Sequence, residues 1–261
     1  MAEYLLIQIS DVHLTPEGSL FRGTLPRANL VAGLAMLAEA GLEPDMFVLT
    51  GDLANAGDSA CYEDLAEIMD SASRATGATV VYLPGNHDLR SEFRRHLLGQ
   101  PASSRPINQV HWCGDLRVIS LDSVVPDEEF GALTGETLEF LGRALSSPAP
   151  DGSILALHHP PIPSPIRPMA RIMLNRPEDL AEVIAGSDVR MILCGHNHHE
   201  GLGTVASIPV WVSPSSAYRL DVLSRDATHG LVGSAFSRID ITERGATASV
   251  IPVPVPGSKR S

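Results

Sequence analysis

The sequence predicts an α/β fold with mixed β-sheets, and three observations support this prediction. In the first half of the chain, short apolar runs bounded by turn residues alternate with longer stretches of helical period, which is the pattern of βα units. Apolar runs at residues 107–113 and 116–121 are separated only by Gly114 and Asp115, which indicates a hairpin that interrupts the alternation. The end of the chain contains strand-like runs with no helix between them, which indicates a second, more antiparallel sheet.

The first half of the chain contains three expected strands, with a helix after each of the first two. The strands are residues 4–9, 46–50 and 79–83, and the helices are residues 26–40 and 59–76. Pro26 suits the first position of a helix, and Gly41 marks where that helix stops. Ser59 can cap the second helix, and Gly77 ends it.

The second half continues with helices and strands and ends in a run of strands. The expected helices are residues 134–145 and 177–185, and the expected strands are residues 154–157, 191–194, 205–212, 231–241 and 247–251. The last three strands are assigned to the second sheet. Residues 252–261 alternate proline and valine before a small basic end, so we expect an extended arm there. No internal repeat or long linker divides the sequence, and we therefore expect one domain over residues 1–261.

Composition and charge restrict the function. With 44% apolar and 19% charged residues over 261 positions, the chain can build a large core. A formal net charge of −12 disfavours long nucleic acids and anionic membranes as partners. The first residues lack a basic flank and a long apolar run, so we expect neither a signal peptide nor a membrane span. Cys61, Cys113 and Cys194 have no obvious pairing pattern, which favours a reducing cytoplasm.

Metal-competent side chains follow five of the predicted strands at the point where each strand ends. The five motifs are Asp11-Val12-His13, Gly51-Asp52, Gly85-Asn86-His87-Asp88, His158-His159 and Gly195-His196-Asn197-His198-His199. Seven of the ten histidines lie in them. In open α/β sheets, the loops that leave the carboxyl ends of the strands converge on one crevice. The motifs are therefore expected to meet.

Taken singly, the first three motifs could be ordinary turns, because Asp, Asn and Gly form turns after strands. The two histidine-rich motifs are more informative. Histidine is not a turn former, and His196 and His198 present two imidazoles from one short loop. Five such coincidences in one chain indicate metal ligation.

The ordered set D-x-H, G-D, G-N-H-D, H-H-P-P and G-H-N-H resembles the signature of the calcineurin-like metallophosphoesterases over residues 5–214. The spacing and the H-H-P-P-I-P continuation are most similar to small bacterial class III cyclic nucleotide phosphodiesterases and their glycerophosphodiesterase relatives. The resemblance implies a four-layer αββα sandwich of two mixed sheets flanked by helices. It also implies hydrolysis of small phosphodiesters, with 3′,5′-cyclic nucleotides first. Glycerophosphodiesters, or a broad range of diesters and monoesters, are the alternative.

The same resemblance implies two divalent metal ions and a hydroxide bridging them that attacks phosphorus. By similarity, the ligands are Asp11, His13 and His198 for one ion, Asn86, His158 and His196 for the other, and Asp52 as the bridge. A short bridging anion is also needed physically, because two cations about 3.5–4 Å apart repel each other. A donor set of imidazoles, carboxylates and one amide suits Mn, Fe, Co or Zn without choosing among them.

Other residues are candidates for contact with the substrate. Asn86 and His87 are expected to contact the phosphate, and His87 is also a candidate acid for the leaving oxygen, with Asp88 either orienting it or acting only in the turn. His159 is a candidate substrate contact. Arg167, in a rim at residues 163–174, could offer a cation to a second phosphate, although a solvated loop or a subunit interface explains that rim equally well.

Several alternatives stay open. Tyr218 could stack on a base or only pack, and His199 could be a satisfied loop residue. Retention of the fold as a binding module without turnover is the remaining functional alternative, although every expected ligand type is present. The expected partner is a small phosphodiester, and a homodimer or higher homo-oligomer is possible.

Overall fold

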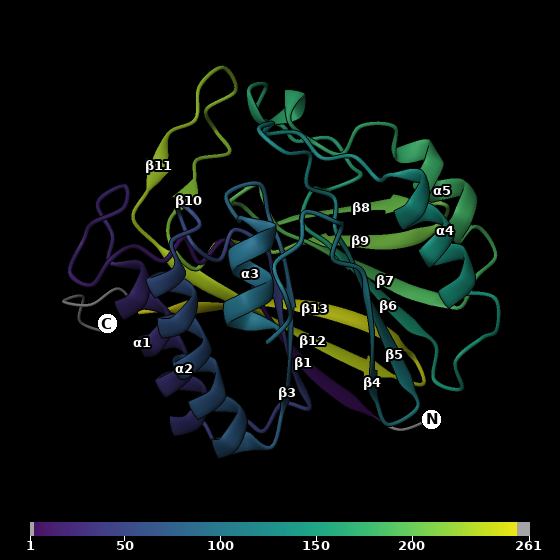
Figure 1. The fold of residues 1–261 in the computed structure, drawn as a ribbon, viewed down its shortest axis with the longest axis horizontal. Coiled ribbons are helices and arrows are strands. Elements are labelled where there is room, and N and C mark those ends of the chain that lie inside the picture. Colours follow the sequence, from purple (N-terminus) through teal and green to yellow (C-terminus); the bar gives the residue numbers. More distant parts are fainter. Residues whose placement is uncertain (1–2, 255–261) are drawn as a thin grey trace.

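The computed structural model describes residues 3–254, and two β-sheets packed face to face form its centre (Figure 1). The first sheet has the strand order β13-β12-β1-β2-β3. Its strands are β1 (Tyr4–Ile9), β2 (Met46–Thr50), β3 (Thr79–Leu83), β12 (Ser234–Thr242) and β13 (Gly245–Val253). β1, β2 and β3 are parallel, and the antiparallel hairpin of β12 and β13 extends the sheet beside β1.

The second sheet has the strand order β4-β5-β6-β7-β9-β8. Its strands are β4 (Gln109–Cys113), β5 (Leu116–Leu121), β6 (Ser153–Leu157), β7 (Val189–Cys194), β8 (Gly201–Val205) and β9 (Ile208–Val212). The four inner strands run parallel, whereas the edge strands β4 and β8 are antiparallel to their neighbours. Both sheets are therefore mixed.

Helices cover the outer face of each sheet (Figure 1). The helices are α1 (Pro26–Glu39), α2 (Ser59–Thr76) and α3 (Arg90–Leu97) on the first sheet, and α4 (Gly135–Ala144) and α5 (Pro177–Ile184) on the second. Val48 of β2 and Val118 of β5 belong to a separate apolar cluster between the two sheets. Strands buried on both faces need near-continuous apolar runs, which is what these segments contain. The predicted four-layer αββα architecture is confirmed.

The remaining short elements lie at the edge where the loops gather. They are the 3₁₀ turn η1 (Met169–Arg171) and the two-stranded pair β10 (Arg219–Leu220) and β11 (Gly230–Leu231). Among the described residues, no helix has the length and hydropathy needed to cross a bilayer.

Four sequence expectations about the fold were wrong, and one concerns Ser59, which is the first residue of α2 and not its cap, since the N-cap is Asp58. Helix α3 was not anticipated, because among its mostly polar residues only Phe93 is buried. The expected single strand over residues 205–212 is correct only for β9 (Ile208–Val212), which pairs with β8 in a hairpin and belongs to the sheet of β7. The described residues therefore do not form the expected second, antiparallel sheet, because β12 pairs with β1 and β13 pairs with β12.

The expected C-terminal arm is only partly covered by the structure. Pro252 and Val253 are the end of β13, where Pro252 lies opposite Ala235. A proline is tolerated there because β13 is an edge strand. Residues 255–261 of that expected arm lie outside the described residues.

Candidate metal centre

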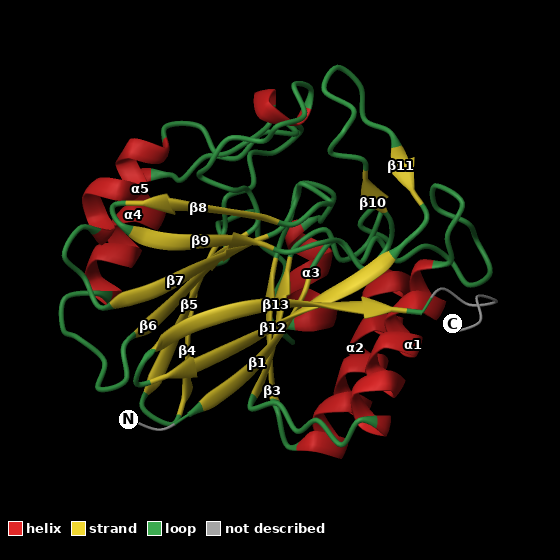
Figure 2. Cartoon of the chain, turned by 180° about the vertical axis from the view of Figure 1, so that it is seen from behind, coloured by secondary structure: helices red, strands yellow, loops and turns green. Residues whose placement is uncertain are grey.

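The loops that follow five strands meet at one edge of the sandwich (Figure 2). The N–H of Asp11, after β1, donates to the carbonyl of Gly51, after β2, at 3.1 Å. The N–H of Gly195, after β7, donates to the carbonyl of His158, after β6, at 3.0 Å. The Nδ1 of His158 lies 2.8 Å from the carbonyl of Thr50, which links the two sheets. The strand ends therefore converge as the sequence predicts.

Five side chains at this convergence stand on backbone of unusual conformation. The residues Asp11, His13, Asp52, His196 and His198 have φ between 45° and 69°. This left-handed region costs residues other than glycine about 1 kcal/mol or more, so it persists only where the surroundings impose it. These five are half of the ten described non-glycine residues with such φ values. Strain gathered in one place points to a functional site.

Two glycines allow the loops to approach closely. A Cβ at Gly85 would overlap the carboxylate and the backbone nitrogen of Asp52, and one at Gly195 would overlap the hydroxyl of Ser10. Each glycine immediately precedes a predicted ligand, Asn86 or His196. These two glycines are thus required by the close packing of the loops.

The first group of predicted ligands is compact and buried. Asp11, His13, Asp52 and His198 are each at most 5% exposed and are arranged so that they could hold a metal ion. The Nε2 of His198 lies 3.1 Å from the Nε2 of His13 and 3.4 Å from Oδ1 of Asp11. The Nε2 of His13 lies 3.6 Å from Oδ2 of Asp52.

The second group shares the same carboxylate oxygen. The Nε2 of His158 lies 3.4 Å from Oδ2 of Asp52, 3.2 Å from Oδ1 of Asn86 and 3.3 Å from Nδ1 of His196. One oxygen of Asp52 therefore lies between an imidazole of each group. The structure brings all seven predicted ligands together around it.

These contacts are those of a donor set rather than of an ordinary hydrogen-bond network. The Nδ1 atoms of His158 and His198 point at the carbonyls of Thr50 and Tyr218, so in the neutral rings the Nε2 atoms carry lone pairs. In the neutral rings those lone pairs face oxygens and nitrogens that are also electron-rich, which is repulsive unless a metal ion or a proton lies between them. Donors bound to one ion at about 2.0–2.2 Å lie roughly 3 to 3.5 Å apart. The residues present fit divalent metals.

The electrostatics favour a cation in this cluster. Burial lowers the pKa of His13 well below its ordinary value and lowers that of His196 to about 3, aided by His158. Burial alone would raise the pKa of Asp52, but the neighbouring imidazoles, chiefly His158, hold it well below the usual range. Burial opposes the charge on His158, yet Asp52 and Asp11 raise its pKa to about 9. Without metal, a proton on His158 supplies the positive charge that Asp52 requires.

His87 stands at the open side of the cluster. Its backbone N–H donates to Oδ1 of Asp52 at 2.9 Å, and its Nδ1 lies 2.8 Å from the carbonyl of Asn55. That contact directs the Nδ1–H away from the cluster and leaves Nε2 for another partner. The side chain is exposed, and its ring centroid is 4.7 Å from that of His13. This is the placement expected of a group that meets a substrate.

A sequence profile described as calcineurin-like phosphoesterase matches residues 4–200. The chain belongs to the calcineurin-like phosphoesterase family. It is 40% identical over 221 residues to a Rhodococcus erythropolis protein named "Probable cyclic nucleotide phosphodiesterase", covering 84% of this chain and 73% of that one. It is 38% identical over 234 residues to a cAMP/cGMP dual specificity phosphodiesterase of Mycobacterium tuberculosis, covering 89% of this chain and 74% of that one.

Solved structures support the fold. A dimetal phosphatase from Danio rerio superposes with a TM-score of 0.65, covering 96% of this chain and 99% of that chain at 13% sequence identity.

Asp88 of this phosphoesterase ties two ligand loops together. It accepts from the N–H groups of Leu53 and Ala54 at 3.1 Å, from the N–H of Gly85 at 2.9 Å, and from the hydroxyl of Tyr62 at 2.8 Å. Burial raises its pKa to about 6, which these hydrogen bonds oppose. Asp88 has no hydrogen bond to His87, so its predicted alternative role in the turn is the one its contacts support. Tyr62, which sequence reasoning missed, gave no signal because its α2 position looks like an ordinary core site.

Three further predicted residues lie away from the open side of the phosphoesterase site. His159 is fully buried, with Nδ1 2.8 Å from the hydroxyl of Ser123 and Nε2 3.2 Å from the carbonyl of Glu129, so both ring nitrogens already have partners. Arg167 pairs with Asp226 at 2.6 Å in an exposed ion pair and does not line the pocket beside the predicted metal ligands. His199 contacts Ser164 at 3.2 Å, as expected of a satisfied loop residue.

A pocket of about 340 Å³ opens beside the predicted metal ligands of the phosphoesterase. One side presents Asp52, Asn86 and His87. The rest of the lining includes an apolar and aromatic set with one arginine, namely Phe21, Arg22, Met169, Ile172, Tyr218 and Leu220. The volume suits a small ligand.

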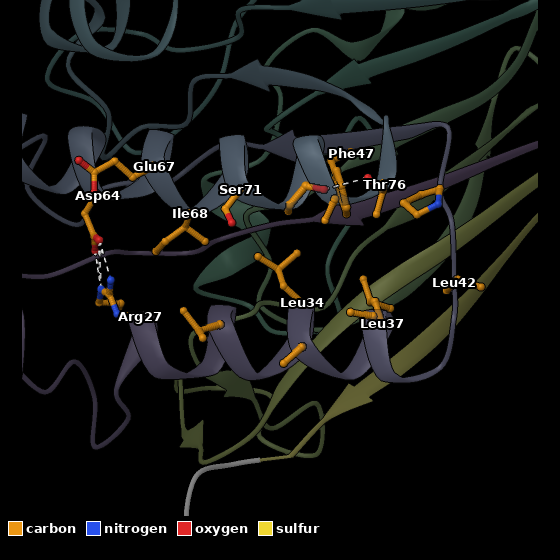
Figure 3. A pocket seen from close by; sticks show the side chains of 16 residues that line it. Arg27, Leu34, Leu37, Leu42, Phe47, Asp64, Glu67, Ile68, Ser71 and Thr76 are labelled. Atoms are coloured by element: carbon orange, nitrogen blue, oxygen red, sulfur yellow. Dashed lines mark hydrogen bonds and ion pairs between the residues drawn. The ribbon is translucent and has the colours of Figure 1, made fainter.

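A second, apolar cavity of about 480 Å³ lies between α1 and α2 (Figure 3). Leu34 and Ile68 project into it, and the ion pair of Arg27 with Asp64 lies at one end. None of the predicted metal ligands lines this cavity, so the chemistry belongs to the smaller pocket.

Proposed function

We propose that this protein is a phosphodiesterase with two divalent metal ions, and that its substrates are 3′,5′-cyclic nucleotides. The observation that carries the proposal is the position of Asp52, whose Oδ2 lies 3.6 Å from a nitrogen of His13 and 3.4 Å from a nitrogen of His158. A carboxylate between two donor groups suits the bridge between two cations. The names of the two bacterial relatives above support the choice of substrate.

In this proposal each ion has its own ligands. Asp11, His13 and His198 hold one, Asn86, His158 and His196 hold the other, and Asp52 bridges them. The mixture of imidazoles, carboxylates and one amide favours Mn, Fe, Co or Zn. When bound, such a pair would lower the pKa of a water to near neutrality and offset the charge of the phosphate oxygens.

The chain's own groups then bind and orient the diester. Asn86 and His87 line the pocket beside Asp52, where a phosphate would lie. The Nδ1 of His87 is held by the carbonyl of Asn55, which points its Nε2 toward that phosphate. At this position the doubly protonated imidazolium of His87 would stabilise a phosphate oxygen through its Nε2–H or transfer that proton to the leaving 3′ oxygen and become neutral.

The setting of the activity also belongs to this proposal. Cys61, Cys113 and Cys194 are free, which agrees with a reducing cytoplasm. The net charge of −12 favours a small substrate over long nucleic acids. A single domain over residues 1–261 and a homodimer or higher homo-oligomer stay predictions.

The test compares the purified protein with its Asp52→Asn variant in Mn²⁺. The substrates are cyclic AMP, glycerophosphocholine and bis(p-nitrophenyl) phosphate. We expect cyclic AMP to give the highest kcat/KM, and we expect Asp52→Asn to lose at least about 100-fold on every substrate. Asp226→Asn is the control and should match the parent, because Asp226 is exposed and its ion-pair partner in the described part of the chain is Arg167.

Two results would contradict the proposal. A variant Asp52→Asn as active as the parent would remove the two-metal mechanism. A clear preference for glycerophosphocholine over cyclic AMP would keep the mechanism and overturn the substrate.

A further inference from the structure

A two-residue turn at the mouth of the pocket places Arg22 at its tip. Phe21 and Thr24 exchange two backbone hydrogen bonds of 3.0 Å, and Arg22 and Gly23 between them have φ of 48° and 81°. Both central residues are thus in the left-handed region, as in the tight turns of β-hairpins. The turn fixes the direction in which Phe21 and Arg22 leave the backbone.

The aromatic rings at the mouth of the pocket contact the imidazole rings of two predicted metal ligands. Phe21 stacks on His13, with ring centroids 4.9 Å apart and planes inclined by 29°. Tyr218 meets Phe21 edge to face at 5.5 Å, and its ring centroid is 4.2 Å from that of His198. A ligand whose phosphate lies at the metal centre therefore has this aromatic wall beside its remaining atoms.

Arg22 is the one lysine or arginine that lines this pocket among the described residues. Its guanidinium carbon lies 5.3 Å from the ring centroid of Tyr218, and no described carboxylate forms an ion pair with it. Nearby arginines are different, because Arg167 pairs with Asp226 and Arg219 pairs with Glu200. The side chain of Arg22 is exposed, and its donors and outer face are available to a ligand.

The surroundings of Arg22 suit a flat heterocycle better than a second phosphate. Met169, Ile172 and Leu220 line the same pocket and carry no hydrogen-bonding side chain. A second phosphate would need several donors, whereas Arg22 is the single lysine or arginine in a lining that also contains Thr228 and the carboxylate of Glu129. A guanidinium stacks on aromatic faces, and its planar donors match the acceptors on a purine edge.

We propose that Phe21 and Arg22 form the nucleobase subsite and that Arg22 binds the purine of a cyclic nucleotide. The proposal rests on the function proposed above and adds the determinant of its substrate class. Arg22 contacts the base, so it contributes to binding rather than to bond cleavage.

The test is steady-state kinetics of the Mn²⁺-loaded enzyme on cyclic AMP, cyclic GMP and methyl p-nitrophenyl phosphate, a diester without a nucleobase. Arg22→Asn removes the guanidinium with a residue that accepts the left-handed backbone. We expect it to raise KM for both cyclic nucleotides about 10-fold, to leave kcat nearly unchanged, and to alter methyl p-nitrophenyl phosphate hydrolysis less than about 2-fold. Because that last substrate reports an intact fold and metal centre, misfolding is detected separately.

Two further variants define the result. Arg22→Lys keeps the charge but not the planar group, so we expect at least about a 3-fold higher KM for cyclic AMP than in the parent. Arg167→Ala, the control at an exposed arginine outside the pocket, should leave every constant unchanged because its side chain pairs with Asp226.

The outcomes separate the two proposals. If the parent hydrolyses cyclic nucleotides and Arg22→Asn leaves their KM unchanged, or weakens all three substrates equally, the subsite is wrong and the proposed function stands. Full recovery by Arg22→Lys also overturns the subsite, since simple charge attraction would then suffice. If the parent hydrolyses methyl p-nitrophenyl phosphate but neither cyclic nucleotide, the proposed function fails and the subsite falls with it.

Discussion

Replacing Tyr62 by phenylalanine tests whether the fold holds the metal-ligand loops through buried hydrogen bonds. The hydroxyl of Tyr62 is fully buried on α2, donates to Oδ1 of Asp88 at 2.8 Å and accepts from the N–H of Leu89 at 3.1 Å. A hydrogen bond to a charged group contributes about 1.5–3 kcal/mol, and the part-buried N–H of Leu89 adds less than the roughly 1–3 kcal/mol that a fully buried N–H costs when it loses its partner. Because the two losses are not additive, we expect Tyr62→Phe to lower the free energy of unfolding by about 3 kcal/mol.

Urea denaturation followed by circular dichroism measures this change, and Tyr82→Phe is the control. Tyr82 is also buried, but its hydroxyl has no hydrogen-bond partner among the described residues. We expect its variant to stay within about 0.5 kcal/mol of the parent. Equal unfolding free energies for Tyr62→Phe and Tyr82→Phe would refute the reasoning. Asp88 fixes the loops of both Asp52 and Asn86, so Mn²⁺ affinity should also fall in Tyr62→Phe and not in Tyr82→Phe.

Three other predictions concern the centre itself. Gly85→Ala should weaken Mn²⁺ binding at least about 10-fold, because its Cβ would overlap Asp52. Gly142→Ala has open space around its Cβ and should bind Mn²⁺ like the parent. Equal Mn²⁺ affinities of the two variants in calorimetry would contradict this. His87→Ala should lower kcat on cyclic AMP about 100-fold and change the Mn²⁺ affinity little. If the Mn²⁺ affinity falls as well, His87 is a metal ligand instead. Mn²⁺ must displace the proton from His158, whose pKa is raised to about 9. The affinity for Mn²⁺ should therefore increase by up to about tenfold per pH unit from pH 6 to pH 8.5. An Mn²⁺ affinity that does not change with pH would show that metal binding displaces no such proton.

Much of the fold follows from local sequence signals. The helices begin and end near Pro26, Gly41 and Gly77 as predicted, because proline and glycine act through the backbone of their own turn. The hairpin of β8 and β9 was not predicted, because its turn residues, Ala206 and Ser207, are not of the types that usually adopt positive φ, although their φ values are 48° and 67°.

Assignment of strands to sheets depended on long-range pairing that no local pattern contains. β12 pairs with β1 across more than two hundred positions of the chain, and β9 pairs with β7. The expected and the observed strand pairings bury the same apolar faces, so the hydrophobic periodicity alone cannot choose between them.

The candidate site was predictable where the residue type itself carries the chemistry. Asp11, His158 and His196 were identified from motifs, and the structure places them together. The residues that surround these ligands could not be predicted in the same way. Arg167 looked like the cation of the rim, but a distant carboxylate, Asp226, pairs with it, while Arg22 comes from a turn that resembles any surface loop. Charge partners from remote segments are set by the fold.

The proposed function depends most on two metal ions lying on either side of the Asp52 carboxylate. Anomalous diffraction from crystals loaded with Mn²⁺ measures this directly. We predict two anomalous peaks about 3.5–4 Å apart, with an oxygen of Asp52 between them. A single peak, or two peaks that Asp52 does not join, would contradict it.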